Sequence, residues 1–261
     1  MIANRESFQN RVERVLARAT QDLLEARSPD GYWVGELSSS ALSTATAVTA
    51  LAMVRKFTGQ SPKTEPPRRE DAVAAASLDP ALDERVRAGL AWLATHQNSD
   101  GGWGDTTISF SNLSTTTLCW AAFGAVPEQA ATHAETVSRA AAWMVQQAGG
   151  IDPDRLARAI LRRYGRDRTF SVPILTLCAL AGRLGEGSGA WRHVIPLPFE
   201  LAACSHQLFA ALRLPVVSYA LPALIAMGQV RHHHLPSRNP ILRAIRVLAR
   251  QRTLNVLSQI Q

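Results

Sequence analysis

The chain has 261 residues, 46% of them hydrophobic, which excludes a largely disordered protein. A net charge of +7 suits a nucleic acid or an anionic membrane surface and does not choose between them. The charged start, Met1 to Ser7, lacks the apolar run of a signal peptide, and no apolar stretch reaches the roughly 20 residues of a membrane-spanning helix. We therefore expect a cytoplasmic protein, with Cys119, Cys178 and Cys204 as buried, reduced thiols because each lies in an apolar segment.

Helical periodicity runs along the whole chain. Val12, Val15, Leu16, Ala19 and Leu23 form one amphipathic stripe, and Leu82, Val86, Leu90 and Leu93 form another. Further helices are predicted at 137–147, 155–164, 174–183, 199–212, 217–227 and 240–258. No segment alternates with the period of two that strands require, so the predicted fold class is all-α. The stretch from about 58 to 79 is rich in proline and charge, which predicts an inserted, mobile loop.

An internal repeat organises these helices. The sequence from Asp30 to Trp33 recurs 70 residues later, from Asp100 to Trp103, and 42–46 recurs as 113–117. Each copy consists of an amphipathic helix, an Asp-Gly turn with a Trp, and a helix of Ala, Ser, Thr and Leu. This order favours an outer helix that covers an inner one, with hairpins stacked into a solenoid or closed into an α/α toroid. An ordinary helical bundle is the alternative.

The second turn has the pattern of a known repeat. Gln97 ends an outer helix and is followed by Gly102 and Trp103, and Gly31 and Trp33 occupy the first copy, with Arg27 near the position of the Gln. Glycine permits unusual backbone angles, and the indole offers a planar packing face. The pattern resembles the "QW" repeat of squalene–hopene-type triterpene cyclases, and 146–151, 162–165 and 194–201 follow in the order of that family's N-terminal domain. We assign the structural repeat to Gly31, Trp33, Gln97, Gly102 and Trp103.

The resemblance implies a fold and an activity. It implies an N-terminal α/α-toroid domain over 1–237, followed at 238–261 by a basic amphipathic helix that begins a truncated continuation, so that the barrel is incomplete. The family protonates a polyprene and cyclises the resulting carbocation, without a metal or organic cofactor. The implied partners are a squalene-like polyprene, a membrane surface on which the enzyme lies as a monotopic protein, and a C-terminal catalytic domain in cis or in trans.

The proton donor of that family is not found in this sequence. The donor is an Asp of an Asp-x-Asp-Asp motif, and alkene protonation requires such an acid to be held neutral. Asp152-Pro153-Asp154 is the nearest match, and its position predicts a helix N-cap. Asp167 is interpreted as a surface charge or cap, and Asp30 and Asp100 belong to turns. We therefore expect no catalytic residue and no activity of the chain alone, either as a fragment or as one half of a split enzyme.

Other candidate sites are weaker. His232 to His234 are adjacent in sequence without further ligands at metal-binding spacing, which favours a solvated loop. Protein prenyltransferase β-subunits share the toroid, but their zinc-binding Asp-x-Cys is missing, and so is the nucleophile elbow of a hydrolase. Four tryptophans could line a cavity that stabilises cations or could belong to the core: Trp92, Trp120, Trp143 and Trp191.

The C-terminal helix is basic and amphipathic. Its apolar face carries Ile241, Ile245, Leu248 and Ala249, and its other faces carry Arg243, Arg246, Arg250 and Arg252. Such a helix either lies on an anionic membrane or is an outer helix with its arginines in water. No groove-reading motif supports nucleic-acid binding. The alternative to a cyclase domain is a non-enzymatic helical-repeat module that binds a lipid or a protein partner.

Overall fold

The computed structural model describes residues 8–35, 38–58, 80–129, 131–204 and 221–260. These ranges contain helices, turns and one isolated antiparallel bridge between Arg27 and Trp33, and no strand, which confirms the all-α prediction for them. The chain divides into two units, Met1–Ser39 and Ser40–Gln261, so the predicted boundary at residue 237 lies inside the second unit. The predicted insert lies almost wholly outside the described residues.

The first unit consists of helix α1 (Phe8–Glu25) and the turn that follows it. The predicted stripe is helical as expected, yet no residue of α1 is buried, and Val15 and Leu16 are among its exposed apolar side chains. Pairs along the helix surface support it, such as Gln21, which donates to Glu25 at 2.8 Å. Helix α1 is therefore amphipathic without a covering layer in its own unit.

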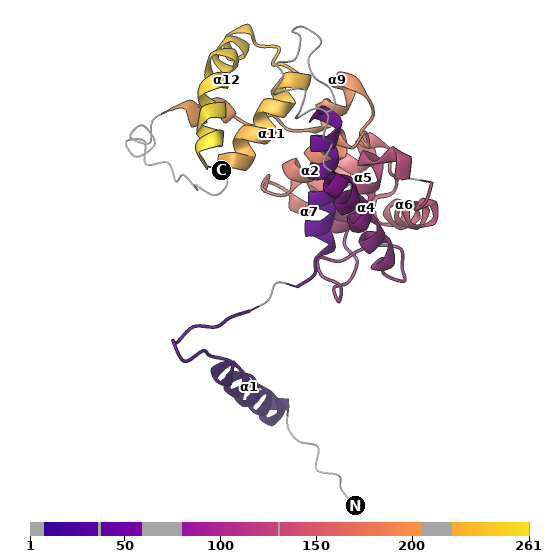
Figure 1. The fold of residues 1–261 in the computed structure, drawn as a ribbon, viewed down its shortest axis with the longest axis vertical. Coiled ribbons are helices and arrows are strands. Elements are labelled where there is room, and N and C mark those ends of the chain that lie inside the picture. The colour runs from indigo at the N-terminus through magenta and orange to yellow at the C-terminus, as the bar shows by residue number, and fades with distance from the viewer. Residues whose placement is uncertain (1–7, 36–37, 59–79, 130, 205–220, 261) are drawn as a thin grey trace, which may run out of the picture. The chain divides into compact units, whose positions relative to one another are not determined.

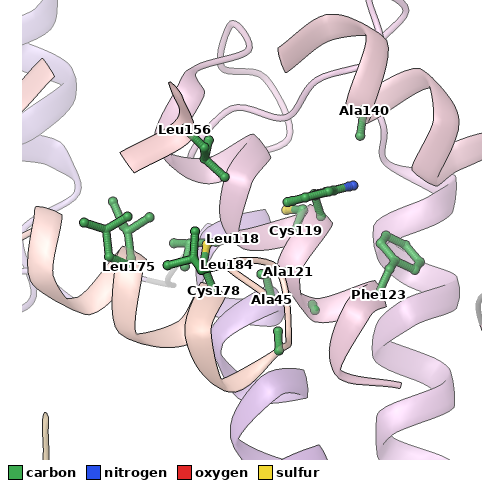
Figure 2. Close-up of a cluster of buried hydrophobic side chains, with 14 of the residues drawn as sticks. Ala45, Leu118, Cys119, Ala121, Phe123, Ala140, Leu156, Leu175, Cys178 and Leu184 are labelled. Atoms are coloured by element: carbon green, nitrogen blue, oxygen red, sulfur yellow. The ribbon is translucent and has the colours of Figure 1, made fainter. Parts of the chain in front are cut away.

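The second unit contains two layers of helices. Helices α2 (Ala41–Thr58), α5 (Leu113–Ala125) and α8 (Ser171–Leu180) pack on one another. They are covered by α4 (Pro80–Thr95), α6 (Ala134–Ala148) and α7 (Pro153–Tyr164), with the short turn η1 (Pro127–Gln129) after α5. Figure 2 shows side chains from both layers meeting in one core: Ala45, Leu118, Phe123, Ala140, Leu156 and Leu175.

Small residues allow the two layers to approach closely. A Cβ atom on Gly89 of α4 would lie only 2.4 Å from a methyl group of Val48 on α2. Around this contact the stripe of α4 is buried, with Val86, Leu90 and Leu93 fully covered. Helix α5 is buried on every side and places the hydroxyl of Thr116 inside the protein. The Ala-, Ser-, Thr- and Leu-rich composition thus marks α2 and α5, the helices of the two repeat copies.

The C-terminal part begins with short elements, α9 (Gly187–Ala190), η2 (Trp191–His193) and η3 (Phe199–Ala203). Helices α11 (Leu221–His234) and α12 (Pro240–Ile260) then pack against each other (Figure 1). The helix predicted at 199–212 is wrong in its described part, where a 3-10 turn ends at Ala203 and Cys204 is extended. A contact with a distant helix holds this segment, because Arg246 of α12 donates to the Leu197 carbonyl and the Glu200 carboxylate.

Helix α12 exists where it is predicted, but its apolar face does not pack inward as that of an ordinary outer helix would. The Arg246 side chain is only 5% exposed and pairs with Glu200 at 3.0 Å, so this arginine is not in water. Ile241 and Leu248 point outward instead, and Leu248 is 82% exposed. The carboxylate and carbonyl partners available at η3 make burial of the guanidinium possible. Among the described helices, none is both long enough and apolar enough to cross a bilayer.

Candidate functional site

The two repeat turns share one hydrogen bond that closes each of them. The indole N–H of Trp103 donates to the carbonyl of Leu93 at 2.9 Å. In the first copy the indole N–H of Trp33 donates to the carbonyl of Leu23 at 2.6 Å. Each acceptor lies in the last turn of the preceding helix, where carbonyls lack partners within the helix. Both tryptophans therefore satisfy a carbonyl at the end of the preceding helix in the same way.

A second side chain fills the same place in both turns. The Gln97 amide donates to the carbonyl of Gly101 at 2.8 Å, and the Arg27 Nε–H donates to the carbonyl of Gly31 at 2.8 Å. Arg27 thus replaces the glutamine without loss of this bond. Two backbone hydrogen bonds repeat as well. In the first copy the Gly31 N–H donates to the Ser28 carbonyl, and the Ser28 N–H donates to the Tyr32 carbonyl. In the second copy the Gly101 N–H donates to the Asn98 carbonyl, and the Asn98 N–H donates to the Gly102 carbonyl.

The glycine that each turn requires is the one after the Asp. Gly31 and Gly101 have φ angles of 89° and 94°, which L-residues rarely adopt. Gly102, the glycine predicted for the second turn, has no positive φ. A side chain is excluded there because a Cβ would lie 2.6 Å from the Cβ of Ser111. The offset of 70 residues from Gly31 points to Gly101, and this signal was missed. Tyr32 replaces Gly102 in the first copy.

The second turn is tied to other helices of its own unit. The Trp103 backbone N–H donates to the hydroxyl of Thr116 on α5 at 3.0 Å, and Gln97 donates to the carbonyl of Thr136 on α6 at 2.9 Å. The residue of α2 that matches Thr116 is Ala45, which has no hydroxyl group. Trp103 is 1% exposed and Trp33 is 48% exposed. The site residues therefore form two similar turns with unequal burial.

The carboxylates around the second turn are held in their charged form. Burial acts to raise the pKa of Asp100, but hydrogen bonds from the Gly102 N–H, the Ser111 hydroxyl and the Trp143 indole hold it below its ordinary value. A hydrogen bond from the Thr115 hydroxyl, with a further one from Asn112, lowers the pKa of Asp105. Neither acid is kept neutral, as protonation of an alkene requires.

The remaining acids of interest lie at or near helix starts, and one of them, Asp152, is a cap. Asp152 is the N-cap of α7 and accepts from the Arg155 N–H at 3.1 Å. Asp154 is exposed and lies 3.7 Å from His193. The Thr169 N–H donates to Asp167 at 2.8 Å and lowers its pKa. These carboxylates stabilise local backbone and are not gathered into an acidic cluster.

The three adjacent histidines do not form a solvated loop, and that interpretation is corrected here. They end helix α11, because the apolar positions before them continue the helix and pack against η3 and α12. His234 stacks on Trp191 with 4.5 Å between the ring centroids, and His232 packs against Phe199 at 5.9 Å. In the described ranges, no group of three or more His, Cys, Asp or Glu side chains is placed to hold a metal ion.

The tryptophans are engaged with neighbouring side chains. The face of Trp120 is covered by the guanidinium of Arg183, 4.0 Å from the ring centroid, and Arg183 also donates to the Trp120 carbonyl at 2.9 Å. Trp92 stacks on His96 at 4.0 Å, and Trp143 donates to Asp100. A face already occupied by a guanidinium is not available to stabilise another cation.

The cysteines are free thiols, and two of them are deeply buried. Burial raises the pKa of Cys178 to about 12 and that of Cys119 well above its ordinary value, so neither is a nucleophile at neutral pH. Cys204 is only half-buried, because it lies at the end of the 3-10 turn η3 and not inside a helix, which corrects the expectation for this residue.

No protein-family model, no curated protein and no solved structure matches this chain.

Proposed function

We propose that this chain is an α/α-toroid domain of a squalene–hopene-type triterpene cyclase, one that forms a wall of a polyprene cavity and does not supply the proton. The observation that carries the proposal is the bond-for-bond correspondence of the two turns, with Trp33 and Trp103 each donating to a carbonyl ten residues earlier. A turn repeated in this detail favours a repeat architecture over an ordinary bundle.

The packing of the second unit supports the toroid part of the proposal. Helices α2, α5 and α8 adjoin one another, and each contacts a covering helix, respectively α4, α6 and α7. An inner layer of largely apolar helices with an outer layer of amphipathic helices is the arrangement that stacked helical hairpins produce. An incomplete barrel of this type is the proposed architecture.

The charged state of the carboxylates supports the inactive part of the proposal. Asp100 and Asp105 accept hydrogen bonds that favour the ionised form, and Asp152 caps a helix. An ionised carboxylate cannot donate a proton to an alkene. In the proposal a domain with Asp-x-Asp-Asp supplies the acid, in the same polypeptide or in another.

The first experiment incubates the purified chain with squalene in detergent and analyses the extract by gas chromatography and mass spectrometry. We expect no cyclic triterpene from the chain alone, and a cyclic product when a separately produced polypeptide that carries Asp-x-Asp-Asp is added. That polypeptide alone is the control. Cyclic product from the chain alone would overturn the conclusion that it lacks the acid. If the chain and the added polypeptide together form no cyclic product, the cyclase assignment is contradicted. Reading the genomic sequence on both sides of this segment tests the same point.

A second candidate, a non-enzymatic module that binds a lipid surface, is favoured by the outer face of α12. Ile241, Ile245 and Leu248 are exposed at helical spacing, with Arg252 one turn further. Flotation with vesicles that contain anionic lipid tests it. A peripheral site on α12 is supported if Leu248→Asp abolishes vesicle binding and Gln251→Asp retains it. Equal loss of binding in both variants indicates a nonspecific effect of the added charge.

A further inference from the structure

A basic cavity lies between the end of α11 and the start of α12. It has a volume of about 340 Å³, at the lower end of the range for small-molecule sites. Four of its lining residues are arginines, Arg192, Arg231, Arg238 and Arg246, and no carboxylate lines it. Such a concentration of guanidinium groups at one concave surface is costly unless an anion compensates it.

The four arginines differ in how they are already satisfied. Arg246 is neutralised by Glu200, at 3.0 and 3.3 Å. Arg231 donates to the carbonyls of Val194 and Leu235, which fixes its direction without cancelling its charge. Arg192 and Arg238 are exposed, and for neither is an ion pair or hydrogen bond found with the described part of the chain. Three guanidinium groups are thus left with positive charge to offer a ligand.

Burial and neighbouring positive charges both act on the basic groups around the cavity. Burial, and after it the charge of Arg246, lowers the pKa of Arg231. The same order of causes, burial and then Arg246 and Arg231, lowers the pKa of the neighbouring His232. The first turn of α12 borders the cavity through Leu242, so the positive end of a 21-residue helix dipole adds to this field.

Apart from the arginines and Ser237, the lining is apolar and indicates what accompanies the anion. Pro196, Leu235, Pro236 and Leu242 share the wall with the arginines. Planar guanidinium groups match the oxygens of a phosphate in pairs, whereas an apolar wall suits carbon atoms attached to it. The chemistry therefore favours a phosphate ester with an apolar part over a bare ion.

We propose that this cavity is a binding site for a phosphate monoester, with Arg192, Arg231 and Arg238 holding the phosphate oxygens. The site is separate from the repeat turns and does not depend on the cyclase assignment. The same phosphate chemistry occurs in a free metabolite and in a lipid headgroup, and the experiment distinguishes these sources.

The test titrates the full chain by calorimetry with two probes, glycerol 3-phosphate and monomeric dihexanoyl phosphatidic acid. Arg192→Gln and Arg238→Gln should each weaken binding roughly tenfold, a factor equivalent to about 1.4 kcal/mol. The matched control is Arg250→Gln, an exposed arginine of α12 outside the cavity, which should bind as the unchanged chain does. Because Arg192 and Arg238 are exposed, these variants should keep the unchanged urea midpoint that shows correct folding.

The pattern of binding decides the source and the proposal. Equal affinity for both probes indicates a free phosphate ester, and at least tenfold tighter binding of the lipid indicates a headgroup. Binding of the lipid alone, weakened by the two cavity variants, also supports the site. The proposal is overturned if neither probe binds, or if the cavity variants bind no more weakly than Arg250→Gln.

Discussion

The indole N–H of Trp103 donates to the carbonyl of Leu93 at 2.9 Å, inside the protein, and this bond attaches the repeat turn to the end of α4. The equivalent bond from Trp33 to Leu23 is formed by an indole that remains half exposed. The same local geometry thus occurs once with burial and once without it, which makes the pair a natural comparison.

Trp103→Ala should lower the free energy of unfolding by roughly 3–5 kcal/mol, because it removes a buried indole and leaves a cavity. The matched change Trp33→Ala should cost less than about 1 kcal/mol, in the range of a surface position. Urea unfolding followed by circular dichroism measures both. Similar losses in the two variants would contradict the unequal burial of the two turns.

Gln97→Glu should destabilise the chain by about 1–3 kcal/mol, because a carboxylate cannot donate to the carbonyls of Gly101 and Thr136 and leaves both without that partner. Gln97→Arg should cost less, since Arg27 makes the matching bond in the first turn. Urea midpoints of the two variants provide the measurement. If arginine proved as damaging as glutamate, hydrogen-bond donation would not be the role of this residue.

Gly101→Ala should be more damaging than Gly149→Ala. Both glycines have a positive φ, but a Cβ on Gly101 would lie 2.9 Å from the Arg139 carbonyl oxygen, whereas a Cβ on Gly149 meets nothing within 4 Å. The difference should be roughly 1–3 kcal/mol, the cost of overpacking. Thermal unfolding of the two variants tests this, and equal losses would show that backbone strain alone governs both positions.

Arg246→Ala should cost about 3–5 kcal/mol, because it leaves the nearly buried Glu200 without its cation. Replacing both residues by leucine should recover most of the loss, since neither charge then remains buried. Arg250→Ala, an exposed change on the same helix, should stay within about 0.5 kcal/mol. A double variant no more stable than Arg246→Ala would mean that packing, not charge, makes Arg246 important.

Asp100 should make the stability of the chain depend on acidity. Its pKa in the folded protein lies below the ordinary value of 3.8, so its contribution is complete above about pH 4 and is lost as the pH falls through the folded pKa. Asp100→Asn should make the free energy of unfolding fall less steeply as the pH decreases through this acidic range. Near neutral pH the dependence of stability on pH should stay unchanged. Unfolding midpoints measured from pH 2 to pH 7 test the direction, and an unchanged acidic slope would contradict it.

Local features of this protein could be predicted from the sequence alone. The helical period predicts α1, α4 and α12, and the repeat from Asp30 to Trp33 predicts two similar turns, because a bond between residues four or ten apart needs only the intervening chain. The predicted capping role of Asp152 has the same basis, since its carboxylate accepts from the N–H of Arg155, only three residues away.

Tertiary structure decided which of these features are buried. Trp103 is covered because Thr116 and Gln97 tie its turn to α5 and α6, and the covering helix α6 lies beyond it in the sequence. Arg246 faces inward because Glu200, 46 residues earlier, offers a carboxylate, and its apolar neighbours are left outside. Periodicity describes only which residues share a helix face; the direction of that face depends on partners distant in sequence, whose positions no local pattern contains.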